Sequence, residues 1–258
     1  MKRVVTALVL IPVVVYVALW GSHWLFLLVT SAVALLCFRE YCGIVASHQI
    51  DKPGPAAYAA GLLVLLTPMP DGLLVTLLAL LALTLMLRSA EMSRGLPGAA
   101  AFVLGIVYIF GTWRCAVPLR AVNPYWLLFA LSLNWVGDTA AYIVGRVAGR
   151  HKLAPRLSPA KTWEGSAASL VASLAFGFFY LGGLIPEVSP EVRLGIAAAG
   201  NIAGQVGDLA ESLMKRGAGL KDSSNLLPGH GGWLDRLDST LFALPVIYGL
   251  LVALGLSH

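Results

Sequence analysis

Charged residues are scarce in this chain. Only 12% of the 258 residues are Asp, Glu, Lys or Arg, whereas 58% are hydrophobic and the mean hydropathy is +0.81. A typical soluble domain is about 45–50% apolar and about 25% charged. The low charge content therefore excludes an ordinary soluble globular domain and indicates a membrane protein.

Cysteine is rare as well, and no β-barrel pattern is present. The three cysteines, Cys37, Cys42 and Cys115, are scattered and form no CxxC or Cys/His metal-binding spacing. We interpret them as small apolar filling residues. The strict alternation of apolar and polar residues that marks membrane-barrel strands is missing, so helices are the expected spanning elements.

Long apolar runs predict an all-α, polytopic integral membrane helical bundle with about nine transmembrane helices. The expected spans are 4–20, 24–38, 56–67, 72–87, 98–112, 124–145, 165–185, 193–214 and 239–256. The first run follows two basic residues, as in a signal peptide, but no small-residue cleavage site follows it. We therefore expect an uncleaved first span.

The distribution of basic residues sets the expected orientation. With the N-terminus in the cytoplasm, 15 of the 18 Lys and Arg residues lie inside, and only Arg114, Arg120 and Arg193 lie outside. The positive-inside rule thus predicts a cytoplasmic N-terminus and an external C-terminus. We expect a multi-pass protein of the cell inner membrane whose active site faces the cytoplasm. The net charge of +5 suits anionic lipid head groups or a polyanionic substrate; we expect no nucleic acid partner.

Polar residues are concentrated in the second half. We expect residues 1–120 to form N-terminal transmembrane helices with no charge inside the membrane. Residues 121–258 are expected to form a catalytic transmembrane region with cytoplasmic loops at 146–164 and 215–238. Acidic residues in or beside the spans of this region are Asp138, Glu164, Asp208, Glu211, Asp222, Asp235 and Asp238. Such residues are costly in a membrane and indicate function, although pairing with Arg146 is an alternative for Asp138.

The eighth expected span ends with polar residues on one helical face. Asp208, Glu211, Ser212 and Lys215 are spaced i, i+3, i+4 and i+7. An internal ion-pair network is an alternative, because Glu211 and Lys215 form an i, i+4 pair. Asp208 has no basic partner nearby in the sequence and lies deeper in the span, which favours a functional role.

The last expected span begins with the same spacing. Asp235, Asp238 and Ser239 stand at i, i+3 and i+4. Helix capping is an alternative, since acidic residues are favoured at helix N-termini. Carboxylates from two neighbouring helices could instead hold hard divalent cations, because Mg²⁺ is typically bound by one or two carboxylates together with substrate phosphate oxygens. A pair of such cations suits phosphoryl-type displacement.

Two loops offer candidate phosphate contacts. Three glycines surround His230, where the backbone could approach a ligand closely and its N–H groups could bind phosphate. Ser158 and Pro159 are expected to open a turn, after which Lys161 and Thr162 at a helix N-terminus form an anion site. The alternatives are an ordinary Gly-rich loop and, for each basic residue, a purely topological role.

These residues resemble the signature of bacterial phosphatidate cytidylyltransferases, also called CDP-diacylglycerol synthases. That signature is similar to S-x-x-K-R-x4-K-D-x5-P-x-H-G-G-x-x-D-R-x-D. Its positions are filled here by Ser212, Lys215, Arg216, Lys221, Asp222, Pro228, His230, Gly231, Gly232, Asp235, Arg236 and Asp238. The upstream elements G-D-T-x-A-Y-x-x-G-R and S-P-x-K-T-W-E-G also resemble the family. The resemblance covers residues 134–242, and Ala160 stands where the family often carries a second Lys.

The resemblance implies that CTP and phosphatidate react to CDP-diacylglycerol and pyrophosphate. It also implies Mg²⁺, with K⁺ as the candidate second cation, a homodimer, and contact with membrane lipids. The implied catalytic residues are Asp208, Asp235, Lys215, Arg236 and His230, and the implied metal ligands are Asp208, Asp235 and Asp238. The implied binding residues are Asp138, Ser158, Lys161, Thr162, Glu164, Ser212, Arg216, Lys221, Asp222, Gly231 and Gly232.

Two other functions fit parts of the pattern. A CTP-dependent polyprenol or lipid kinase would transfer the γ-phosphate of CTP instead of the cytidylyl group. A cation-coupled secondary transporter could use intramembrane carboxylates, but such folds usually contain two matching halves. No convincing internal repeat is present in this chain.

Overall fold

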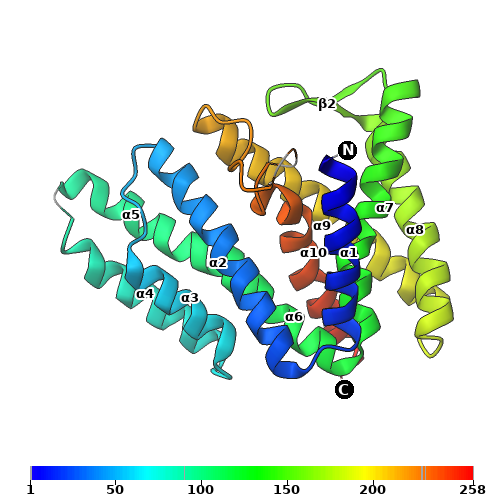
Figure 1. Cartoon of the computed structure of the whole chain (residues 1–258), viewed down its shortest axis with the longest axis horizontal. Helices are drawn as coiled ribbons and strands as arrows, with labels where there is room; N and C mark the ends of the chain where they lie inside the picture. Colours follow the sequence, from blue (N-terminus) through cyan, green and yellow to red (C-terminus); the bar gives the residue numbers. More distant parts are fainter. Residues whose placement is uncertain (1, 90, 228, 230, 258) are drawn as a thin grey trace. The chain divides into compact units, whose positions relative to one another are not determined.

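The apolar runs fold into helices (Figure 1), and most of the breaks between these helices contain Gly, Pro or Asn, although Gly95 and Pro97 lie inside a helix. The computed structural model describes residues 2–89, 91–227, 229 and 231–257, with the backbone alone for residues 2–10. The helices are α1 (Lys2–Leu19), α2 (His23–Ser47), α3 (Pro55–Leu66), α4 (Asp71–Met86), α5 (Met92–Gly105), η1 (Ile106–Gly111), α6 (Thr112–Val122), α7 (Pro124–Ala148), α8 (Trp163–Leu184), α9 (Pro190–Gly217) and α10 (Leu234–Ala253). Two short strands are β1 (Lys152–Ala154) and β2 (Ser158–Thr162).

Several of these helices are suited to a bilayer. Within the described residues, five helices are long and apolar enough to cross a membrane: His23–Ser47, Met92–Val122, Pro124–Ala148, Trp163–Leu184 and Leu234–Ala253. Two shorter apolar helices are Pro55–Leu66 and Asp71–Met86. The expectation of a predominantly helical membrane protein is thus confirmed, while the number of spans and the sides on which the termini lie stay predictions.

Helix α2 is longer than the sequence suggested. We expected this span to end at residue 38, before Arg39 and Glu40, but the helix continues to Ser47. It begins at the N-cap Ser22, whose side chain accepts a hydrogen bond from the backbone N–H of Leu25. Beyond the helix, Gln49 has a positive φ of 61°, and the chain then turns. The helix thus extends nine residues beyond the expected end of the span, and the side of the membrane on which Arg39 lies stays a prediction.

The fifth expected span is also longer. Helices α5, η1 and α6 form one continuous helical segment, Met92–Val122, with a π-helical stretch at its centre. Arg114 and Arg120, which we expected in an external loop, therefore lie in a helix. Each guanidinium is satisfied by backbone carbonyls: Arg114 donates to the oxygen of Val64 at 3.1 Å, and Arg120 to that of Ala18 at 2.8 Å. Both carbonyls lie in the last turn of a helix, where cations are favoured.

A small hairpin stands in the expected loop 146–164. Strands β1 and β2 pair antiparallel, with Lys152 opposite Thr162 and Ala154 opposite Ser158. The turn lies at residues 155–157, so Ser158 is in a strand rather than at the opening of a turn as we expected. The all-α prediction is corrected to this extent.

The chain divides into two compact units. The first contains Met1–Val9, Ser22–Arg114 and Met214–Arg236, and the second contains Leu10–Gly21, Cys115–Leu213 and Leu237–His258. In the first unit, the core packs aromatic side chains of α2 and η1: the rings of Phe38 and Phe110 are 5.3 Å apart, and Phe38 also contacts Tyr41. The hydroxyl of Tyr41 donates to the carbonyl of Ala101 in α5 at 2.9 Å.

The second unit is organised around α7, α8 and α9. Helices α7 and α8 run side by side in Figure 1 and pack against each other along their lengths. Gly137 of α7 faces the side chains of Ser169 and Asn201, and no Cβ fits there without displacing them. Small and polar residues at such contacts let membrane helices approach closely and form hydrogen bonds.

Candidate active site

A buried ion pair joins the two ends of the segment that links α9 and α10. In the first unit, Nζ of Lys215 lies 2.5 Å from Oδ1 of Asp235, and the two side chains are 11% and 5% exposed. Lys215 is near the C-terminal end of α9, and Asp235 is in the first turn of α10. The sequence singled out both residues without indicating that they pair.

The carboxylate of Asp235 also accepts hydrogen bonds from the α9–α10 loop, residues 218–233. The backbone N–H of Ser223 donates to Oδ2 at 2.9 Å, its hydroxyl donates to the same oxygen at 2.8 Å, and the N–H of Gly232 donates to it at 2.7 Å. Because two carboxylate oxygens offer about four lone-pair sites, these donors and Lys215 nearly saturate the group. Asp235 therefore fixes the fold of this loop.

The two glycines after His230 are required by this packing. Gly231 has a φ of +80°, which favours glycine, and a Cβ there would lie 2.6 Å from Oδ2 of Asp235. A Cβ on Gly232 would collide with Ser223 Oγ and with a carboxylate oxygen of Glu40. Packing alone therefore requires glycine at these two positions. The phosphate contact that we predicted for them stays a prediction.

Glu40 is a residue that our sequence reasoning missed. It lies on α2, is only 3% exposed, and has four donor groups of the α9–α10 loop and the start of α10 within hydrogen-bond distance of its carboxylate. Glu40 lies in residues 1–120, for which we predicted no charge inside the membrane; that prediction concerns a bilayer and stays a prediction. An acidic residue inside a run of apolar helical positions, with Phe38, Tyr41 and Ile44 buried around it, was the available signal.

A second ion pair lies in the second unit. Nζ of Lys161, at the end of β2, is 2.5 Å from Oδ2 of Asp208 on α9, and the side chains are 25% and 29% exposed. Ser212 Oγ, one turn further along α9, lies 3.4 Å from Oδ1 of Asp208. We expected Asp208 to have no basic partner nearby in the sequence, but a basic partner comes from a distant part of the chain. The β1–β2 hairpin supplies one from 47 positions upstream.

A chain of buried amides and hydroxyls continues from this pair along α9. Nε2 of Gln205 donates to Oδ1 of Asn201 at 2.7 Å, and Nδ2 of Asn201 donates to the hydroxyls of Ser169 and Ser173 at 2.9 Å each. Gln205 also contacts Ser166 of α8. These bonds fix α9 against α8, so the backbone that carries Asp208 is rigidly supported.

The hairpin that carries Lys161 is held at its base. Thr162 is the N-cap of α8, and its hydroxyl accepts from the backbone N–H of Gly165 at 3.1 Å. Nδ1 of His151 lies 2.6 Å from Oε1 of Glu164. As expected, the helix begins just after Lys161 and Thr162. In this arrangement Thr162 and Glu164 stabilise the local fold, and Lys161 forms an ion pair with Asp208.

The remaining expected site residues that the structure describes make local contacts or are exposed. Arg216 donates to the backbone oxygen of Leu220 at 3.2 Å, and Asp238 Oδ1 accepts from the N–H of Ser239 at 2.6 Å. Ser158 lies in β2. Side chains that are exposed include Asp138, Lys221, Asp222 and Arg236. His230 and Pro228 lie outside the described residues, so the predictions that rest on them stay predictions.

The two proposed metal carboxylates differ in their remaining capacity for a cation. Asp208 is partly exposed and has one ion pair and one long hydrogen bond, so its oxygens can accept a metal. Asp235 does not fit a metal ligand in this arrangement, because Lys215 and loop N–H groups already surround its oxygens. Among the described residues, no group of three or more His, Cys, Asp or Glu side chains converges as a preformed metal cage. Mg²⁺ commonly needs no such cage, since substrate phosphates supply further ligands.

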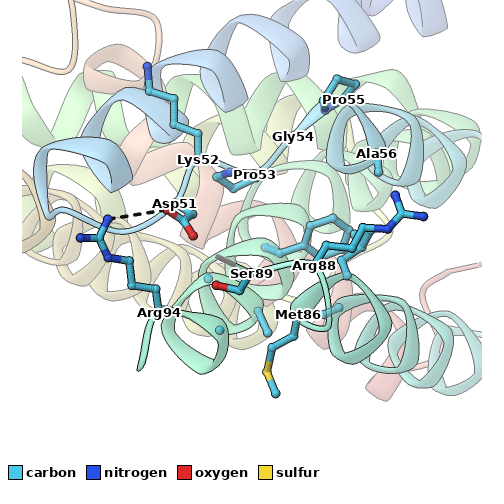
Figure 2. Close-up of a pocket in the computed structure, with 16 residues that line it drawn as sticks. Asp51, Lys52, Pro53, Gly54, Pro55, Ala56, Met86, Arg88, Ser89 and Arg94 are labelled. Carbon is cyan, nitrogen blue, oxygen red and sulfur yellow. Dashed lines mark ion pairs between the residues drawn. The ribbon is translucent and has the colours of Figure 1, made fainter. Parts of the chain in front are cut away.

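A cavity elsewhere in the first unit does not involve these residues. It has a volume of about 310 Å³ and lies between the loop after α2 and the α4–α5 connection, with Phe102, Ala82 and Leu85 among its apolar lining residues. Figure 2 shows Asp51 and Arg94 paired at one end of it, 4.0 Å apart, while the charged ends of Lys52 and Arg88 point in different directions. The charges do not converge as a phosphate site requires.

Comparison with known proteins places the chain in a family over nearly its whole length. The sequence model described as the cytidylyltransferase family matches residues 1–254. A phosphatidate cytidylyltransferase of Pseudomonas aeruginosa is 39% identical over 271 aligned positions, which cover 98% of this chain and 97% of that protein. Proteins of the same name from Staphylococcus saprophyticus and Staphylococcus aureus strain COL are 33% and 32% identical, each over 97% of this chain and 98% of theirs. The chain belongs to the cytidylyltransferase family.

Proposed function

We propose that the chain is a phosphatidate cytidylyltransferase, a nucleotidyltransferase that converts CTP and phosphatidate to CDP-diacylglycerol and pyrophosphate. The supporting observation is similarity, over nearly the whole length, to relatives that carry this name. Residues 212–238, which contain the family signature, also form the most polar part of an otherwise apolar chain. The apolar helices fit a substrate whose acyl chains stay in a bilayer.

The reaction needs no covalent intermediate on the protein. An oxygen of the lipid phosphate attacks the α-phosphorus of CTP and forms a new P–O bond. The bond from the α-phosphorus to the oxygen that bridges it to the β-phosphate breaks, and pyrophosphate leaves with that electron pair. The lipid phosphate is already ionised at neutral pH, so no strong general base is required. Both reactants are anions, and the barrier is therefore largely electrostatic.

The chain's own cations can offset this repulsion. Lys161 presents an ammonium group from a hairpin strand, and its partly exposed position allows it to exchange Asp208 for a phosphate oxygen. Exposed Lys221 and Arg236 offer further positive charge in or next to the α9–α10 loop. Lys215 is buried against Asp235, and its positive charge contributes to offsetting this repulsion from that buried position. In this proposal His230, Arg216 and Asp138 contact substrate, as the resemblance implies.

Asp208 is the residue best suited to hold Mg²⁺, since it combines a carboxylate with partial exposure. A bound cation would supply Lewis-acid stabilisation of the phosphate charges during transfer. Asp235 could act as a ligand only after losing Lys215 or a loop donor. We retain Asp235 and Asp238 as proposed ligands, and K⁺ as the proposed second cation, on the resemblance alone.

The proposed orientation places the active site at the cytoplasmic face of the inner membrane. It is supported by the positions of the Lys and Arg residues. In the predicted topology, 15 of these 18 residues lie on the cytoplasmic side. CTP would then reach the basic loops directly from the cytoplasm. The homodimer implied by the resemblance remains part of the proposal and is testable by the mass of the purified protein in detergent.

Product analysis with labelled CTP tests the proposed function. We expect label from the α-phosphorus of CTP to appear in the extracted lipid product, and label from the γ-phosphorus to appear in pyrophosphate. Membranes that lack the protein serve as the control. Transfer of γ-label to lipid would instead show a kinase, and cation flux with no chemical change in CTP would show a transporter.

Replacement of Lys161 is expected to weaken the use of CTP. In Lys161→Ala, loss of an ammonium group that contacts phosphate should raise the KM for CTP about tenfold, which corresponds to about 1.4 kcal/mol, with a smaller change in kcat. Steady-state kinetics at varied CTP measure this. Lys152→Ala is the matched control, because Lys152 lies exposed on the partner strand of the same hairpin; its KM should stay within twofold. An unchanged KM in Lys161→Ala would contradict the assignment.

A further inference from the structure

We propose that Glu40 of α2 is a positioning residue for cytidylyl transfer, because it holds the α9–α10 loop and the start of α10 in place. This inference deepens the proposed function and rests on it for its kinetic part. The sequence pattern did not suggest this role, since the family signature lies more than 170 residues further along the chain.

The contacts of Glu40 are made by both of its carboxylate oxygens. Oε1 accepts from the hydroxyl of Ser224 at 2.6 Å and from the backbone N–H of Trp233 at 3.0 Å. Oε2 accepts from the hydroxyl of Ser223 at 2.9 Å and from the backbone N–H of Leu234 at 2.8 Å. All four donors belong to the first unit, as Glu40 does.

The Trp233 and Leu234 contacts act as a helix cap from a distant part of the sequence. Helix α10 begins at Leu234, and the first backbone N–H groups of a helix have no partner within the helix. A carboxylate there is also favoured by the positive end of the helix dipole. The polar atoms of a side chain that is only 3% exposed are thus provided with hydrogen-bond donors.

Ser223 links Glu40 to Asp235. Its hydroxyl lies 2.9 Å from Oε2 of Glu40 and 2.8 Å from Oδ2 of Asp235, yet it has one proton and can donate to only one carboxylate at a time. Asp235 in turn pairs with Lys215. A displacement of Glu40 therefore changes the position of the Asp235–Lys215 pair through a single shared side chain.

A second contact from α2 supports the other end of the loop. Nε2 of His48, near the end of α2, lies 2.9 Å from the backbone oxygen of Met214 on α9. Helix α2 thus contacts the chain both just before and just after the α9–α10 loop. The loop that carries Lys221, Asp222 and Gly231 is held at two points by one apolar helix.

The main test compares Glu40→Gln with the parent protein in purified, detergent-solubilised form. Gln keeps the size of the side chain but turns one of the two acceptors into an NH₂ group, which then faces a backbone N–H that cannot reorient. We expect kcat to fall at least about tenfold while the KM for CTP changes less than about threefold, because the positioned groups act in the transition state. Glu40→Asp, which keeps the charge, should recover part of the lost kcat.

Hydrogen exchange provides a readout that does not depend on activity. Amides of residues 231–234 should exchange faster in Glu40→Gln, whereas amides of α7 and α8 should keep the parent rates. Glu91→Gln is the matched control, because Glu91 is an exposed acid of the same unit and pairs with Arg94; neither the kcat nor the exchange rates of this variant should change. A folded Glu40→Gln protein with a kcat within twofold of the parent, or with unchanged exchange at residues 231–234, would overturn the proposal.

A milder variant covers the case in which Glu40→Gln does not fold. Ser224→Ala removes one of the four donors, and it should lower kcat about threefold and raise exchange at the same amides; no change in either would reject the proposal. In a folded double variant, Ser224→Ala should add little to the effect of Glu40→Gln, as expected for residues that act together. If the parent transfers no cytidylyl group, the proposed function fails, and the exchange measurements still decide whether Glu40 holds the loop.

Discussion

Asp235→Asn is expected to lower kcat by about a thousandfold or more, equivalent to about 4 kcal/mol of activation free energy. The substitution removes the partner of the buried Lys215 ammonium and puts an NH₂ group among the donors Ser223 and Gly232. The loop should lose its order as a result. The free energy of unfolding should also fall, by about 3–5 kcal/mol, because the buried Lys215 ammonium loses the carboxylate of Asp235. Cytidylyl transfer at saturating CTP and thermal unfolding in detergent measure the two effects.

A double variant separates the two consequences of this substitution. Lys215→Met combined with Asp235→Asn removes both members of the buried ion pair, so the thermal midpoint should return toward that of the parent while activity stays absent. Asp71→Asn serves as the control, since Asp71 pairs with Arg114 at 3.4 Å but is largely exposed, and it should change neither quantity. Parent-like turnover in either Asp235 variant would remove this residue from the catalytic machinery.

The sequence predicted the positions of the helices well and their ends less well. Apolar runs located each helical segment, because membrane spanning requires about 20 apolar residues. The ends failed where charged side chains occur inside helices. Arg114 and Arg120 suggested a loop, but backbone carbonyls from other helices satisfy their guanidinium groups. Such long-range partners leave no trace in local composition.

The same limitation applies to the candidate site. Residues 212–239 were recognisable because charge and glycine are concentrated there in a chain that has little charge. The pairs Lys215–Asp235 and Lys161–Asp208 were not predictable, since spacing places side chains on a helical face but does not identify a partner from another element. Glu40 was missed for that reason: its hydrogen-bond partners are 183 to 194 positions away. The sequence also did not show why residue 232 must be glycine, because the reason is its close contact with Glu40.

Asp208→Asn is expected to abolish turnover with little effect on folding, in contrast to Asp235→Asn. The Lys161–Asp208 pair is more than a quarter exposed on average, and ion pairs of this kind contribute about 1 kcal/mol or less. The α8–α9 hydrogen bonds through Asn201 and Gln205 hold the backbone independently of this pair. We therefore expect a thermal midpoint within about 2–3 °C of the parent, because a change of 1 kcal/mol shifts the midpoint of a protein this size by about 2–4 °C. Glu187→Gln, an exposed acid of the same unit, is the control.

Asp208→Glu distinguishes a metal ligand from a simple partner of Lys161. Glu keeps the negative charge and can still pair with Lys161, but it moves the carboxylate by one methylene, which a metal that demands near-ideal octahedral geometry tolerates poorly. If Asp208 holds Mg²⁺, the Mg²⁺ concentration that gives half-maximal turnover should rise about tenfold or more in Asp208→Glu, with the KM for CTP less affected. If the carboxylate serves only to hold Lys161, the Mg²⁺ requirement should match that of the parent. A parent-like Mg²⁺ titration together with normal turnover would therefore reject the proposed metal role of Asp208, because the charge alone would then be sufficient.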